Sequence, residues 1–193
     1  MGFRLTPIFI TNQASVSNEE LLEAVGLTGL IKGKVVDFYT TNKDQDTVFI
    51  GSKGDCKILC DGDLCYEAFV GESRLLRLKD CEIAAIIWNE TADNYGFCLI
   101  KNGKIERKVM VSDGDVSYDY GQPIQEEIDL ANDSLFEPEE IEEILEREGQ
   151  EGLEKTIKSE IICRATNRIV KRYLGAKLVE IQESIELYEY EEV

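Results

Sequence analysis

The stretch from Cys81 to Val111, CEIAAIIWNETADNYGFCLIKNGKIERKVMV, decides the fold. It contains three strand-like segments, Cys81–Trp88, Asn94–Lys101 and Lys104–Val111, and the last two are separated only by Asn102-Gly103. An Asn-Gly pair favours a two-residue hairpin turn, because both positions of that turn need a positive φ. The three segments are therefore predicted to form an antiparallel meander in the central part of a sheet.

The same stretch predicts the register of the hairpin and the burial of its first strand. With a two-residue turn, Lys101 pairs with Lys104 and Glu106 faces Leu99. Residues 83–88 are continuously apolar instead of alternating with polar residues. Such a run is typical of a strand that is buried on both faces.

Further strands are predicted on both sides of the meander. Asp61-Gly62 resembles a second two-residue turn and would join two of them as a hairpin, with Ile58 opposite Cys65. The final segment alternates imperfectly, so a helix stays open as the alternative there. The predicted segments are Arg4–Ile10, Lys34–Tyr39, Thr47–Gly51, Cys56–Cys60, Asp63–Phe69 and Leu178–Tyr190.

The sequence predicts helices from the residues that begin and end them. Ser17-Asn-Glu-Glu20 is a capping box and begins a short helix. Pro138 suits the first position of a second helix, which Gly149 ends. A third helix is predicted over Leu153–Leu174, before Gly175, and its wide apolar stripe indicates that it packs on the sheet.

These elements predict an α+β fold. We expect a largely antiparallel sheet of about six to eight strands, with one long C-terminal helix packed on a face and two short helices at its margins. The length of 193 residues suits a single domain over 1–193. Residues 1–111 would form its sheet-rich portion, and residues 112–193 the acidic segment, the helix pair and the terminal strand.

The negative charge is regional. The whole chain carries −18, and residues 112–152 hold fifteen acidic residues against one base, Arg147. The next segment, 153–175, is basic, with six Lys/Arg against two Glu. If the helices before and after Gly149 pack as a hairpin, their opposite charges face each other. The segment 113–133 and the Glu-rich C-terminus then remain for a partner.

We therefore predict a partner-binding surface made of carboxylates from the 113–133 segment, and a basic protein is the partner that this charge favours. Nucleic-acid binding and membrane binding are disfavoured by the same charge. The oligomeric state does not follow from the sequence. The predicted partner-binding residues are Asp113, Asp115, Asp119, Glu126, Glu127, Asp129 and Asp133.

The absence of histidine narrows the chemistry further. It removes Ser-His-Asp and Cys-His nucleophilic catalysis in their usual forms and histidine-based metal centres. We expect no catalytic residue, metal or cofactor. Without a secretion signal, the six cysteines are expected to be reduced, buried thiols in a cytoplasmic protein. Gly2 and Thr6 match a myristoylation pattern, which we interpret instead as part of the first strand.

Three functions stay open. The first is a non-enzymatic interaction protein that binds a basic partner, as an immunity protein or antitoxin neutralising a basic toxic enzyme would, or a mimic of nucleic-acid charge. The second is a hydrolase that uses carboxylates and Mg²⁺ or Mn²⁺. The third is a protein whose acidity serves solubility alone.

Overall fold

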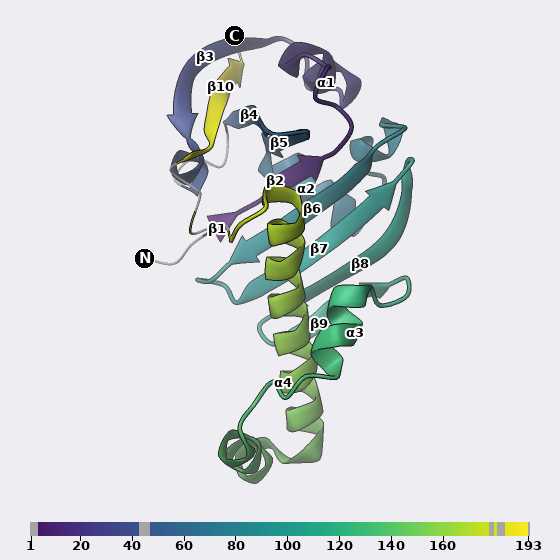
Figure 1. The fold of residues 1–193 in the computed structure, drawn as a ribbon, viewed down its shortest axis with the longest axis vertical. Helices are drawn as coiled ribbons and strands as arrows, with labels where there is room; N and C mark the ends of the chain where they lie inside the picture. The colour runs from purple at the N-terminus through teal and green to yellow at the C-terminus, as the bar shows by residue number, and fades with distance from the viewer. Residues whose placement is uncertain (1–3, 43–46, 178–179, 181–183, 193) are drawn as a thin grey trace.

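The computed structural model describes residues 4–42, 47–177, 180 and 184–192. The strands are β1 (Arg4–Leu5), β2 (Pro7–Ile10), β3 (Leu30–Asp37), β4 (Val48–Lys53), β5 (Cys56–Cys60), β6 (Glu82–Asn89), β7 (Asn94–Lys101), β8 (Lys104–Ser112), β9 (Asp115–Tyr120) and β10 (Glu186–Glu192). Within the described residues these ten strands form one antiparallel sheet in the order β3-β10-β4-β5-β2-β6-β7-β8-β9, and β1 also pairs with β6 (Figure 1).

Helices cover both faces of this sheet. They are α1 (Asn18–Ala24), α2 (Gly62–Val70), α3 (Gln125–Ala131) and α4 (Pro138–Leu174), with short 3₁₀ helices at Phe38–Asn42 and Arg74–Arg77. Figure 1 shows α4 extending across one face of the sheet, with α3 beside it. The α+β class predicted from the sequence is confirmed.

The predicted meander is present. β6, β7 and β8 pair in turn, and Asn102 and Gly103 take the positive φ values, 50° and 71°, that the turn needs. Residues 83–87 are all buried, in agreement with their continuous apolar run. The register beyond the turn differs from the prediction: a bulge follows the Ile100–Ile105 pair, so Leu99 pairs with Arg107 and not with Glu106.

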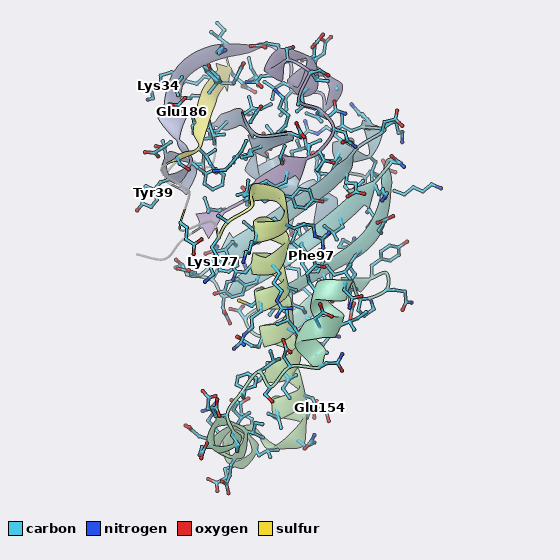
Figure 2. The ribbon with its side chains drawn as sticks, viewed as in Figure 1. Lys34, Tyr39, Phe97, Glu154, Lys177 and Glu186 are labelled. Atoms are coloured by element: carbon cyan, nitrogen blue, oxygen red, sulfur yellow. The ribbon has the colours of Figure 1, made fainter. Side chains whose placement is uncertain are left out.

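Two apolar clusters, one on each face, hold the layers together. On the α4 face, Ile162, Ala165 and Ile169 are fully buried and pack in one cluster with sheet residues that include Phe97. Figure 2 labels Phe97 beside α4, over the strands of the sheet. On the opposite face, α1 and α2 bury Leu21 and other apolar side chains against neighbouring strand positions. The predicted packing of the long C-terminal helix on one face is therefore confirmed, and α1 and α2 cover the opposite face as well.

The second predicted hairpin is wrong. The segment 63–69 is not a strand, because Asp61 begins α2: its side chain accepts a hydrogen bond from the Leu64 N–H at 2.6 Å. The buried residues Leu64, Cys65, Ala68 and Phe69 follow helical spacing and cover the sheet. Ile58 consequently pairs with Phe9 and Gly51, and not with Cys65.

The sheet has more strands, among the described residues, than the six to eight expected. The first predicted strand divides into β1 and β2, and β9 forms at the far edge. Of the predicted terminal strand, residues 178, 179 and 181–183 lie outside the described residues, as does Gly2, and β10 covers the end of it. No helix of the described chain is long and apolar enough to cross a membrane.

The cap at Asp61 gives a stability prediction. Asp61→Ala removes the acceptor for the Leu64 N–H and should lower the free energy of unfolding by about 1 kcal/mol, measured by urea denaturation. Asp63→Ala is the matched control, because Asp63 lies in the same first turn but is exposed and caps nothing. A loss for Asp61→Ala no larger than that for Asp63→Ala would contradict the capping role.

Candidate functional site

The carboxylates predicted to bind a partner lie on β9, α3 and the adjoining turns, alongside the C-terminal part of α4. Four of the six basic residues of α4 that follow Gly149 contact them directly. Each pair joins segments that are distant in the sequence. The four ion pairs are Lys155–Asp115 at 2.7 Å, Lys158–Asp119 at 2.8 Å, Arg168–Asp133 at 3.2 Å, and Arg172–Glu126.

A fifth predicted carboxylate, Glu127, is buried in an ion pair with Arg107 of β8. The Arg107 side chain is 3% exposed and that of Glu127 is 7% exposed. Arg107 donates through Nε and Nη2 to both Glu127 oxygens, at 2.9 and 2.7 Å, and through Nη1 to Asp119 at 2.6 Å. The same Nη1 also donates to the backbone carbonyls of Tyr120 and Gly121. This bidentate geometry is the strong form of an arginine–carboxylate contact.

The two remaining residues differ from these five. Asp129 accepts a hydrogen bond from Gln125 at 2.6 Å, and Asp113 is exposed in the β8–β9 turn with a φ of 51°. Five of the seven carboxylates are thus paired with bases of the same chain. The surface between 113 and 133 presents less uncompensated charge to a partner than its sequence indicates.

A dense cluster of exposed carboxylates lies on the first part of α4, which we call the acidic arm (residues 137–151). Pro138 stands in its first turn, and the Glu140 side chain accepts from the Glu137 N–H at 2.8 Å. Gly149 interrupts the helix with φ 73° and ψ −173°. In Figure 1 the arm is seen nearly end-on below the sheet, and does not lie alongside the rest of α4.

The arm carries eight acidic residues and one base, for a net charge of −7. Among the described residues, the ion pairs of the arm are those from Arg147 to Glu143 and Glu148, inside the arm itself. The helical hairpin with facing charges is therefore wrong: the bases of α4 pair with β9, α3 and the turn after it. All the acidic side chains of the arm are exposed: Glu137, Glu139, Glu140, Glu142, Glu143, Glu146, Glu148 and Glu151.

The cysteines offer no reactive group. All six are free, as expected, and five are buried. Burial raises the pKa of the Cys60 and Cys98 thiols to about 12, so neither forms a thiolate near neutral pH. Within the described part of the chain, no three Cys, Asp or Glu side chains converge as a metal site would require.

We found no match to this chain among protein-family models, curated proteins or solved structures. What the protein does must therefore be inferred from its own side chains. Its carboxylates beside α4 are paired with bases from distant segments, whereas the ion pairs of the arm's carboxylates, among the described residues, are with Arg147 of the arm itself.

The buried pair at Arg107 should dominate the stability of this region. Arg107→Met leaves Glu127 charged and buried without its partner, and we expect a loss of about 3–5 kcal/mol in the free energy of unfolding. Arg172→Met removes an exposed pair and should cost less than about 1 kcal/mol. Urea denaturation of both variants checks this, and equal losses would contradict it.

The pH dependence of stability gives a second test. Hydrogen bonds from Lys158 and Arg107 hold the pKa of the Asp119 carboxyl below its usual value. A lowered folded-state pKa stabilises the fold above the unfolded pKa of about 4, and this contribution is lost as the pH falls through the folded-state pKa. Asp119→Asn should therefore be less stable than the wild type at pH about 6, and the difference should shrink below pH about 4.

Urea denaturation at several pH values measures that difference directly. Asp113→Asn serves as the control, since Asp113 is exposed on the same edge of the sheet and forms no ion pair with another described residue. A stability difference between the wild type and Asp119→Asn that stays constant over this range would contradict the assignment.

Proposed function

We propose that the protein is a non-enzymatic interaction protein and that the acidic arm is the surface that binds a basic protein partner. The observation that carries the proposal is that the arm keeps a net charge of −7 exposed. Four bases of the remainder of α4, in contrast, are paired with carboxylates of β9, α3 and the turn after α3. Figure 2 shows the side chains of the lower end of the molecule, beyond Glu154, spread around the arm and away from the sheet.

Part of the charge of the arm is unfavourable for the helix. Glu139 and Glu140 favour the N-terminal end of the helix dipole, but Glu146 and Glu148 lie in the last turn before Gly149, where negative charge is unfavourable. Glu139 and Glu143, and likewise Glu142 and Glu146, are four residues apart and repel each other along the helix. A charge that lowers helix stability is better explained by an external partner than by the fold.

A basic partner fits this surface in two ways. Binding relieves the repulsion between neighbouring glutamates, and the field of the whole chain, −18, speeds the approach of a cation. Leu145 is 37% exposed among the carboxylates and supplies an apolar contact for the centre of an interface. An immunity protein or antitoxin that neutralises a basic toxic enzyme would use such a surface.

The metal-dependent hydrolase is supported less well. It would require three or more carboxylates around one cavity, and the described residues bring no such group together. The carboxylates that do approach one another beside α4 are paired with arginine and lysine. A cation competing for Asp119 or Glu127 would have to displace Arg107.

Neutralising the arm tests the proposal. The quadruple variant Glu139→Gln, Glu142→Gln, Glu143→Gln and Glu146→Gln should bind a lysine-rich peptide of about ten residues at least about tenfold more weakly than the wild type at low salt. Fluorescence anisotropy of the labelled peptide measures the dissociation constants. Helix content should not fall, since glutamine is a good helix former.

The control variant loses the same charge from exposed positions outside the arm. Its substitutions are Glu23→Gln, Asp55→Asn, Glu72→Gln and Glu106→Gln. It should keep the wild-type affinity to within about twofold. If the two quadruple variants lose affinity equally, the binding reflects net charge alone and the acidity serves solubility.

A further inference from the structure

A cavity of about 420 Å³ opens at one end of the sheet, where β1, β6, β7 and β8 meet beside the first turn of α2. Ile87 and Met110 line it and belong to the apolar cluster under α1 and α2, which places the cavity on the α2 face of the sheet. The described residues around it include no carboxylate of the acidic arm or of the ion pairs beside α4. The cavity is therefore separate from both.

The floor of this cavity combines polar and apolar positions. Asn89 and Ser112 pair with Asn94 from its two sides, so the three form one row across adjacent strands. Ile87 and Met110 lie two positions earlier on the outer two of these strands, and positions two apart on a strand share a face. Ile87 is 9% exposed and Met110 is 8% exposed. A ligand on this floor therefore meets a polar edge with apolar surface beside it.

Polar side chains around the cavity have hydrogen-bonding capacity that the protein does not use. Among the described residues, the hydroxyls of Thr6 and Ser112 and the carboxylate of Asp63 form no hydrogen bond. A serine or threonine hydroxyl both donates and accepts, whereas a carboxylate accepts. Sugar hydroxyls also both donate and accept, so this set of groups can pair with them. The cavity therefore suits a ligand rich in hydroxyl groups.

Tyr66 of α2 supplies an aromatic surface at the same cavity. It follows Asp63 by three residues, so the two lie on one side of the helix, and both line the cavity. Tyr66 is 52% exposed. The face of an aromatic ring is negative and attracts the C–H groups on the apolar face of a sugar ring. Tyr66 can therefore contact the ring of a sugar while Asp63 accepts from its hydroxyls.

The charges at the cavity favour a neutral ligand. Arg4 and Asp63 line it with opposite charges, and the chain as a whole carries −18 and repels anions. A guanidinium has several donors and a carboxylate has two acceptor oxygens, so each can bind two neighbouring hydroxyls of one sugar. A neutral sugar is therefore favoured over a sugar acid or a sugar phosphate.

We propose that this cavity binds a neutral sugar of one or two rings. The Tyr66 ring packs against the C–H face of the sugar, and the Asp63 carboxylate accepts hydrogen bonds from its hydroxyls. Cavities of about 300–1,000 Å³ are the usual size for small ligands. The proposal does not rest on the acidic arm and stands independently of the basic partner.

A panel of neutral sugars tests the binding. The isotope-labelled protein is titrated with methyl glucoside, methyl galactoside, methyl mannoside, maltose and lactose, and its chemical shifts are followed by NMR. The sugar that binds best should shift the signals of Asp63, Tyr66 and Met110, with a Kd on the order of 1 mM. The uronate of that sugar should bind more weakly, because of the net charge of the chain.

Two substitutions of exposed residues test the assigned contacts. Tyr66→Ala removes the aromatic surface and Asp63→Ala removes the acceptor, and each should weaken the binding of the best sugar about tenfold. Neither side chain is buried, so the Tm of each variant should stay close to that of the wild type. Tyr120→Ala is the matched control, because Tyr120 is 57% exposed and lies outside this cavity. It should leave sugar binding unchanged.

Three results would each overturn the proposal. The first is the absence of shift changes at the cavity for every sugar of the panel up to concentrations of about 100 mM. The second is an equal response to sorbitol, an open-chain polyol that has the hydroxyls of a sugar but no ring. The third is undiminished binding of the best sugar by Tyr66→Ala and Asp63→Ala.

Discussion

The buried guanidinium of Arg107 is the contact on which the C-terminal half of the molecule depends. It joins β8 to α3 through Glu127 and to β9 through Asp119 and the Tyr120 and Gly121 carbonyls. Asp119 in turn accepts from Lys158 of α4. One arginine therefore connects the edge of the sheet to both helices on that face, and an unpaired charge at this depth would be strongly destabilising.

The bulge at Glu106 places Arg107 on that face. Ile105, before the bulge, packs with the cluster under α2, whereas Val109, after it, belongs to the α4 cluster. Without the extra residue, alternation would keep Ile105, Arg107 and Val109 on one face. The Asn102-Gly103 turn was predictable because its chemistry is local, but the bulge was not, since the side chain that it reorients, Arg107, binds Glu127, twenty residues away.

The sequence predicted an element correctly where the local pattern is typical of only one kind of element. The continuous apolar run at 83–87 and the capping box at Ser17 are of this kind. Asp61-Gly62 admits two meanings, because aspartate begins helices as readily as it forms turns. The competing strand interpretation failed since Leu64 and Phe69 are buried at helical spacing against the opposite face of the sheet. The sequence of the short helix α3 carries no comparable signal of a helix.

Charge counted along the sequence does not reveal which carboxylates of 113–133 are paired with bases, because their partners are distant in the chain. Arg172 contacts Glu126 across 46 residues, and Lys158 contacts Asp119 across 39. Such pairs form only after α4 has docked on the sheet, and docking is driven by Ile162, Ala165 and Ile169. The apolar stripe of α4 therefore decides which carboxylates form ion pairs with bases of α4. The helix break at Gly149 separates the arm from the rest of α4, and the carboxylates of the arm form no ion pair with described residues outside it.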